Sequence, residues 1–297
     1  MSDHKHLYLV DGSAYIFRAY YSLPPLTNPA GVPVGAVAGY SNMLWKLASD
    51  LHAADGPTHM AVVLDKAGTS FRNEIYDQYK ANRPPAPEDL RPQFPLIRDA
   101  TLAFSLPMIE EENVEADDMI ACYTKAARAQ GWNVSIISSD KDLMQLVGDG
   151  VDMFDTMKDK RIGRDEVIEK FGVGPELVGD VLALMGDSSD NVPGVPGIGP
   201  KTATKLITEY GNLEAVLAAA PDMKPSKMRD NLIENAELAR LSKVLVTLKE
   251  DCPLPIPLEE MVLGPIPEEP LRPFLEEHGF RSLLNRIGKT SDTASAN

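Results

Sequence analysis

Nine acidic side chains stand at positions in this 297-residue chain from which they could hold metal ions. They are Asp11, Asp65, Glu115, Asp117, Asp118, Asp140, Asp142, Asp187 and Asp190. Taken singly, each fits an ordinary role, because acidic residues are common at helix caps, first helical turns and tight turns. Taken together, so many carboxylates would repel one another strongly unless cations were bound. The grouping therefore favours a metal site.

The donor atoms indicate which metal. Carboxylate oxygens without a nearby cluster of Cys or His select hard cations, so we expect two Mg²⁺ or Mn²⁺ ions rather than zinc. Two such ions about 4 Å apart can activate a water and stabilise the departing oxygen of a phosphodiester. Calcium storage is a weaker alternative because no EF-hand spacing is present, and the five scattered histidines give little support to a histidine-based hydrolase.

Three short apolar runs predict buried strands of a parallel sheet, and each leads into aspartates of the acidic set. They are residues 7–10, 61–64 and 134–137. Because the carboxyl ends of parallel strands form the ligand-binding edge of an open α/β sheet, we expect these aspartates to lie close together. Helical patterns between the strands, at residues 35–54 and 116–130, complete a layered α/β domain over residues 1–165.

The rest of the chain differs from this domain. Residues 71–107 are polar and proline-rich at their front and carry basic residues, which favours a functional loop. Apolar periodicity from Arg164 onward predicts an all-helical domain over residues 166–260, followed by a carboxyl-terminal extension and polar linker over residues 261–297.

A glycine- and proline-punctuated turn, residues 186–201, connects two predicted helices of the second domain. It could be only a tight connection. Glycine also lets a backbone approach a phosphate, which the N–H groups of the turn and of the next helix can then grip. The residues expected to bind nucleic acid here are Gly197, Gly199, Lys201, Thr202 and Lys205.

Several strings resemble the 5′ nuclease domain of bacterial DNA polymerase I, within the wider flap endonuclease family. They are LVDGSAYIFRAYY, LDKAGTSFRNEIYDQYKANRP, EADDMIA, SSDKDLMQL and LMGDSSDNVPGVPGIGPKTA, in the family's order and over nearly the whole chain. The resemblance implies a PIN-like parallel-sheet core with a helical arch over residues 71–107. It also implies a helix-three-turn-helix module that binds duplex DNA and a K⁺ ion.

The resemblance also implies roles for single residues. Asp11, Asp65, Glu115, Asp117 and Asp118 would serve one metal site, and Asp140, Asp142, Asp187 and Asp190 a second.

Basic residues of the arch would act on the substrate. Lys80 and Arg83 would meet the scissile phosphate as charge accumulates in the transition state. Tyr79 is either a base-stacking residue or a buried aromatic of the arch, and Arg72 contacts either a phosphate or a structural ion-pair partner.

We therefore expect a structure-specific 5′ nuclease, both 5′-3′ exonuclease and flap endonuclease, that acts in replication, including RNA primer removal, and in repair. Its partners would be 5′ flaps, nicked or branched duplexes and 5′ ends of DNA. A non-catalytic DNA-junction binding module is the alternative, and a PIN-class ribonuclease a weaker one. The SDTASAN ending has the composition of a linker, so we expect proofreading and polymerase domains to follow in a longer chain.

Composition bounds the setting. The net charge of −15 argues against a nucleic-acid partner unless bound cations neutralise the acidic cluster and the basic residues gather locally. No run of about 18 apolar residues and no signal-peptide layout is present, so we expect a cytoplasmic protein without membrane contact. The two isolated cysteines indicate neither zinc nor disulfides, and a monomer is expected.

Overall fold

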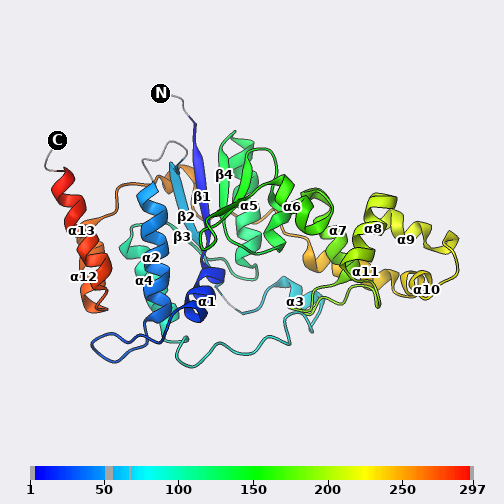
Figure 1. The fold of residues 1–297 in the computed structure, drawn as a ribbon, viewed down its shortest axis with the longest axis horizontal. Helices are drawn as coiled ribbons and strands as arrows, with labels where there is room; N and C mark the ends of the chain where they lie inside the picture. Colours follow the sequence, from blue (N-terminus) through cyan, green and yellow to red (C-terminus); the bar gives the residue numbers. More distant parts are fainter. Residues whose placement is uncertain (1–3, 51–55, 67, 295–297) are drawn as a thin grey trace.

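The computed structural model describes residues 4–50, 56–66 and 68–294. Its sheet has the strand order β3-β2-β1-β4-β5-β6 (Figure 1). The bounds are β1 His6–Asp11, β2 His59–Val63, β3 Met108–Ile109, β4 Asn133–Ile137, β5 Val151–Asp155 and β6 Lys160–Ile162. Neighbouring strands run parallel except β5 and β6, which pair antiparallel. The predicted parallel sheet is confirmed, and β5 and the edge strands β3 and β6 are additions to it.

Side chains of β1 alternate between two hydrophobic cores. Leu7 and Leu9 pack on one face with α5 (Ala116–Ala129), while Tyr8 and Val10 pack on the other with α2 (Gly35–Ser49). A strand buried on both faces must be apolar throughout, which explains the continuous apolar runs. The last residues of the helix predicted at 35–54 lie partly outside the described residues.

The predicted arch differs from the structure. Only α3 (Phe71–Ile75) and α4 (Gln93–Ala103) are helical in residues 71–107, and the connection between them, residues 76–92, carries no regular helix. Helix α4 belongs to the core, because Ile97 and Ala100 are fully buried among the residues of α2. Residues 76–92, here called the crossing segment, are thus shorter than the predicted arch of residues 71–107 and contain no regular helix.

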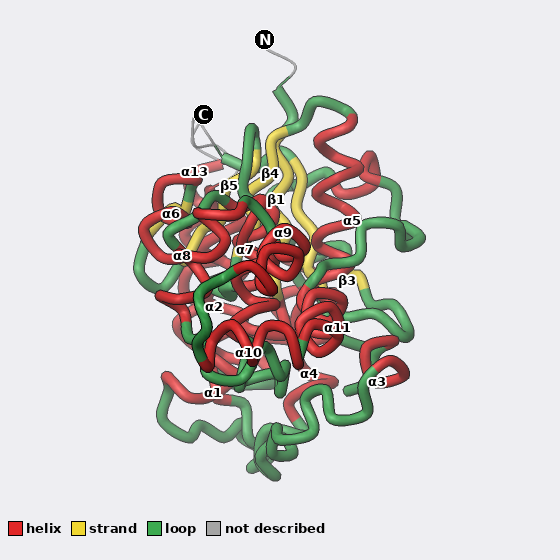
Figure 2. The backbone as a smooth tube through the Cα atoms, turned by 90° about the vertical axis from the view of Figure 1, so that its right-hand side faces the viewer, coloured by secondary structure: helices red, strands yellow, loops and turns green. Residues whose placement is uncertain are grey.

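The second part of the chain is helical, as predicted. Its elements are α6 (Arg164–Phe171), α7 (Pro175–Met185), α8 (Pro200–Tyr210), α9 (Leu213–Ala219), the 3₁₀ turn Ala220–Asp222, α10 (Lys227–Glu234) and α11 (Ala236–Val246). Figure 2 looks from this end, with α8 to α11 in front of the strands. Helix α7 packs on α11 and on the 3₁₀ helix Asp142–Leu146 that follows β4, which joins this part to the sheet.

The carboxyl-terminal extension returns to the sheet domain. After the 3₁₀ turn Leu258–Met261, the Leu263 amide donates to the Thr58 carbonyl at 3.0 Å. Helix α12 (Glu268–Glu277) then packs on α4, and α13 (Arg281–Ala294) packs on α12. The tail predicted to be polar linker from residue 290 is therefore helical as far as Ala294. No helix in the described ranges has the length and apolar character needed to cross a membrane.

Candidate active site

Three strands end in carboxylates that face one hollow. Asp11, the last residue of β1, is 2% exposed; its Oδ1 accepts a hydrogen bond from the Ala14 amide at 3.0 Å and its Oδ2 accepts one from the Ser138 hydroxyl at 2.7 Å. Asp65 follows β2 and accepts from the Ala116 amide at 2.8 Å. Asp140 follows β4. The expectation that the strand-end aspartates lie close together is therefore confirmed, because all three line the same hollow.

Helix α5 adds acidic residues from its amino-terminal turn. Glu115 caps the helix, and Asp117 and Asp118 lie in the first turn, where the helix dipole favours negative charge. Glu115 and Asp117 line the same hollow, which has a volume of about 250 Å³. Its charged lining is Asp11, Asp65, Lys80, Arg83, Glu115, Asp117, Asp140, Lys141, Asp142 and Asp190.

The loop after α7 brings the last two aspartates. Asp187 forms an ion pair with Lys141 and accepts hydrogen bonds from Ser189, whose amide lies 2.9 Å from its Oδ1. Asp190 pairs with Arg83 at 2.5 Å. Asp187 lines a smaller adjoining hollow that Asp117, Asp142 and Asp190 also line. The two predicted sets of metal ligands are thus neighbours, because Asp117 of the first set and Asp142 of the second line both hollows.

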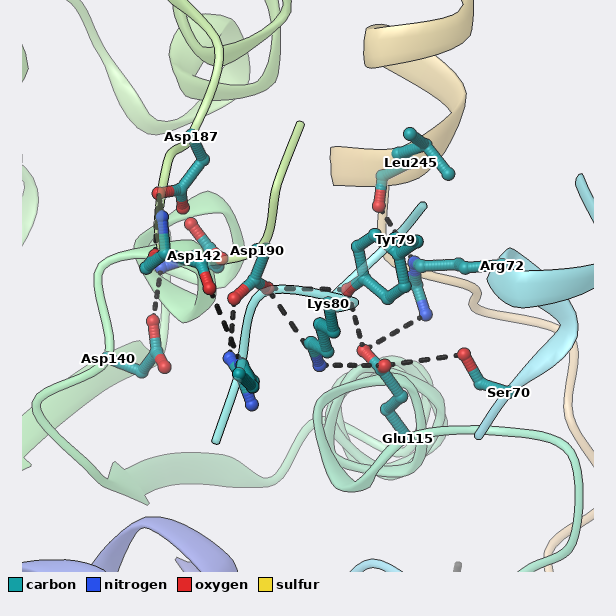
Figure 3. Close-up of polar contacts among 12 residues, drawn as sticks. Ser70, Arg72, Tyr79, Lys80, Glu115, Asp140, Asp142, Asp187, Asp190 and Leu245 are labelled. Atoms are coloured by element: carbon teal, nitrogen blue, oxygen red, sulfur yellow. Dashed lines mark hydrogen bonds and ion pairs between the residues drawn. The ribbon is translucent and has the colours of Figure 1, made fainter. Parts of the chain in front are cut away.

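Basic residues from the crossing segment already neutralise part of this charge. The Lys80 ammonium lies 2.7 Å from Glu115 and 3.8 Å from Asp190. Burial disfavours its charged form, but the two carboxylates outweigh burial and raise its pKa. Figure 3 shows Lys80 between the two acids. Lys80 therefore stays protonated in the position predicted to meet a phosphate.

Burial and like charges make several carboxylates hard to ionise. Burial, with a smaller contribution from Asp140, raises the pKa of both Asp11 and Asp142 to about 7. Burial and the neighbouring Asp140 and Asp11 raise the pKa of Asp117 well above its ordinary value. For Asp187 burial acts the same way, but Lys141 and Ser189 outweigh it and lower the pKa. Unlike Asp187, the carboxylates with raised pKa values, Asp11, Asp117 and Asp142, have no basic ion-pair partner in the described residues.

We expect the stability of the metal-free protein to fall as the pH rises from about 4 to about 7. Over this interval the folded protein binds more protons than the unfolded chain at Asp11 and Asp142, whose pKa values are raised to about 7, so deprotonation disfavours the folded state. Thermal melting in EDTA across this pH range tests this. The Asp142→Asn variant should show a shallower decline, and a melting temperature that rises steadily to pH 7 in both proteins would contradict the assignment.

The donor set suits a hard cation, since the lining offers carboxylate oxygens without a Cys or His. In the described part of the chain, no three acidic, His or Cys side chains lie close enough together to hold an ion in their present positions. Three of the acids that line the hollows are in ion pairs, because Lys80, Arg83 and Lys141 pair with Glu115, Asp190 and Asp187. Eight of the nine predicted ligands line the two hollows without forming a finished site, whereas Asp118 lines neither and is buried against Arg72.

Arg72 has the geometry of the structural alternative. Its side chain is 1% exposed and donates two hydrogen bonds of 2.7 Å to Asp118, which is completely buried. Its other donors reach the carbonyls of Leu245 and Thr247 at the end of α11 and the Glu115 carboxylate at 3.4 Å. The Arg72 guanidinium is therefore committed to joining α3, α5 and α11, with no exposed face for a phosphate.

Tyr79 likewise matches the buried alternative. It is 4% exposed, and its hydroxyl donates to Glu115 at 3.1 Å and to Asp190 at 3.3 Å. A ring in this position has no free face on which a base could stack. Its hydroxyl instead links the two acidic sets.

Three further residues at the site, Lys141, Asn82 and Asn191, were not predicted from the sequence. A lysine between the two aspartates of SSDKD was a usable signal for Lys141, since it had to lie at the same strand end. The asparagines gave none, because their amides donate to backbone carbonyls of Ser188 and Gln78, more than 100 residues away in the chain.

The predicted DNA-binding turn is exposed. Gly197 has φ +77° and Gly199 caps α8, and both glycines are exposed, as are Lys201 and Lys205. Thr202 is half-buried in the first turn of α8. The turn thus offers exposed backbone and two ammonium groups.

Comparison with known proteins decides the family. Residues 6–172 match the family described as 5′-3′ exonuclease, N-terminal resolvase-like domain, and residues 173–269 match 5′-3′ exonuclease, C-terminal SAM fold. The chain belongs to the 5′-3′ exonuclease family. The predicted resemblance and fold class are thereby confirmed. A 5′-3′ exonuclease is a nuclease and therefore a hydrolase, so the predicted enzyme class is confirmed as well.

The chain is similar both to one part of longer proteins and to a protein of about its own length. It is 52% identical to DNA polymerase I of Rhizobium leguminosarum over 98% of the chain, but it spans only 29% of that relative. It is 35% identical to the 5′-3′ exonuclease of Aquifex aeolicus, with 98% of each covered. Among solved structures, the flap endonuclease of bacteriophage T5, in a complex with DNA and metal ions, has a TM-score of 0.68 and 26% identity, covering 93% of this chain and all of the T5 chain.

Proposed function

We propose that the chain is a structure-specific 5′ nuclease that hydrolyses DNA phosphodiesters at 5′ flaps, nicks and 5′ ends, with two divalent metal ions. The observation that carries the proposal is the hollow in which carboxylates from three strand ends, α5 and the loop after α7 face Lys80 and Arg83. Carboxylates that can hold metal ions, beside cationic side chains that can contact a phosphate, suit phosphodiester hydrolysis. A solved relative that holds DNA and metal ions together supports it.

The metal ligands we propose are the nine predicted acids. Two Mg²⁺ or Mn²⁺ ions, when bound, would activate the attacking water and stabilise the departing 3′ oxygen. Asp11, Asp65, Asp117, Asp140 and Asp142 are the strongest of the nine, because they line the hollow and, among the described residues, no basic side chain lies within ion-pair distance of them. For Asp118 the case is weaker, since both its oxygens are held by Arg72 and by the Lys249 amide at 2.9 Å.

The basic residues are proposed to act on the phosphate. Metal ions that neutralise Glu115 and Asp190 would release Lys80 and Arg83 from their ion pairs. The two side chains could then donate to the phosphate oxygens and stabilise the negative charge that develops on them. The turn before α8 would hold the duplex through the Gly197 and Gly199 backbone, Lys201, Thr202 and Lys205, with K⁺ as its cation. DNA replication and repair are the processes that such cutting would serve.

We expect Mg²⁺-dependent cutting of an end-labelled 5′-flap duplex near the junction, and none in EDTA, because the carboxylates cannot act on a phosphate unless cations neutralise them. An equivalent RNA flap and a blunt duplex are the matched substrates. Tight, salt-sensitive binding of the flap without cutting would contradict the proposal and favour the DNA-junction binding module. Equal cutting of the RNA flap would favour the ribonuclease alternative.

A further inference from the structure

The crossing segment and the loop that carries Asp187 and Asp190 are held together by neutral hydrogen bonds, here called the latch. The Lys80 amide donates to the Asp190 carbonyl at 2.9 Å. The Asn82 side-chain amide donates to the Ser188 carbonyl at 2.7 Å, and that of Asn191 donates to the Gln78 carbonyl at 2.6 Å. These contacts pair residues 78–83 with residues 187–191 independently of the ion pairs in the hollow.

The loop on one side of the latch is closed on itself. Backbone hydrogen bonds of 2.9 and 2.8 Å join Asp187 and Val192 in both directions, and Asp187 also accepts from the Ser189 amide. The chain then passes Gly194, whose φ of +63° and close approach to Gly186 leave no room for a side chain, since a Cβ would lie 2.3 Å from the Gly186 nitrogen. The hydrogen bonds and the close approach of Gly194 to Gly186 thus join the loop directly to the turn that leads to α8.

On both sides, the latch holds residues other than glycine in the left-handed region. Lys80 in the crossing segment has φ +56° and Asn191 in the loop has φ +58°. This conformation is unfavourable for lysine and better tolerated by asparagine. The Lys80 amide and the Asn191 side chain are themselves latch donors. The hydrogen bonds therefore fix the backbone from which the Lys80 ammonium reaches Glu115.

We propose that Asn82 and Asn191 are positioning residues that hold Lys80 and Arg83 over the carboxylate hollow and couple their position to DNA seated on the turn before α8. The proposal rests on the nuclease function proposed above. It explains why two uncharged side chains make long-range contacts at the rim of a charged site. It also gives duplex binding at α8 a mechanical route to the cations that meet the phosphate.

Two substitutions each remove one side-chain donor of the latch. Asn82→Ala deletes the Asn82 amide and is the cleaner of the two. Asn191→Gly deletes the Asn191 amide and keeps the left-handed backbone accessible, but glycine also adds backbone freedom at this position. Asn42→Ala is the matched control, because its amide also donates to a backbone carbonyl, that of Ala38 at 2.8 Å, but within α2. Each latch variant should slow single-turnover cutting of saturating 5′-flap DNA about 10-fold, since misplacement by about 1 Å can cost up to about 100-fold. Flap affinity and melting temperature should stay near those of the control.

Limited trypsin digestion in EDTA reports on the latch without any need for nuclease activity. Lys80, which precedes Ala81, is the trypsin site of the crossing segment, because Arg83 and Arg91 each precede a proline, and the Lys80–Ala81 bond should be cut faster in both latch variants than in Asn42→Ala. Faster digestion together with slower cutting supports the proposal. Control-like digestion overturns it, and so does faster digestion with unchanged cutting. If the wild-type chain cuts no DNA, the proposed function fails, while control-like digestion would separately refute the latch.

Discussion

Asp117→Ala is expected to lower the single-turnover rate of flap cutting by about 1,000-fold or more, with flap affinity retained or increased. Asp117 lines both hollows, and its pKa is raised by burial and by Asp140 and Asp11, so it lies at the centre of the negative charge. Removing one metal ligand forfeits several kcal/mol of transition-state stabilisation, and each ~1.4 kcal/mol is a factor of ten. Binding should not suffer, because a negative charge near the phosphates is lost. Rates with saturating Mg²⁺ and a separate binding titration measure both effects.

Asp165→Ala is the matched control for that substitution. Asp165 is the second residue of α6 as Asp117 is the second of α5, so both variants lose the same interaction with a helix amino terminus. Asp165 is exposed and does not line either hollow. The control should cut flaps at the wild-type rate. Cutting by Asp117→Ala within about tenfold of the control would remove Asp117 from the metal site.

The central strands and the acidic edge were predictable from sequence for a physical reason. A strand buried on both faces is mostly apolar, so β1, β2 and β4 are evident as short apolar runs, that of β4 being interrupted by the buried, hydrogen-bonded Ser135. The strand order brings their carboxyl ends together. Strand β5 escaped because it lies near the edge, where residues such as Asp152 are only partly buried and the apolar run is broken. Helix α4 escaped because its proline-rich neighbourhood indicated a loop.

Contacts between distant segments were not predictable in the same way. Whether Arg72 faces a phosphate or an acid depends on where Asp118 and the end of α11 lie in space, and no local pattern encodes that. The same holds for the amides of Asn82 and Asn191, which bind carbonyls that any residue type would provide. Residue types at strand ends identified the charged site, whereas the side chains that orient it needed the folded structure.

Arg72→Met is expected to lower the free energy of unfolding by about 3–5 kcal/mol, the usual cost of removing one partner from a buried ion pair. The substitution would leave the Asp118 carboxylate buried without its counter-ion and the carbonyls of Leu245 and Thr247 without their donor. Chemical denaturation in EDTA measures the change. Adding Asp118→Asn to the same chain should recover part of the loss, because the uncompensated charge disappears while an oxygen remains for the Lys249 amide.

Arg164→Ala separates this role from a general effect of losing an arginine. Arg164 also makes a bidentate pair, with Glu176 at 2.9 and 2.7 Å, but both side chains are more than half exposed, so water and salt screen the interaction and little stability should be lost. If Arg72→Met is no less stable than this control yet cuts flaps far more slowly, Arg72 contacts the phosphate. A large loss of stability that Asp118→Asn partly reverses instead makes the pair the link that holds α5, and the carboxylates at its start, against the helical domain.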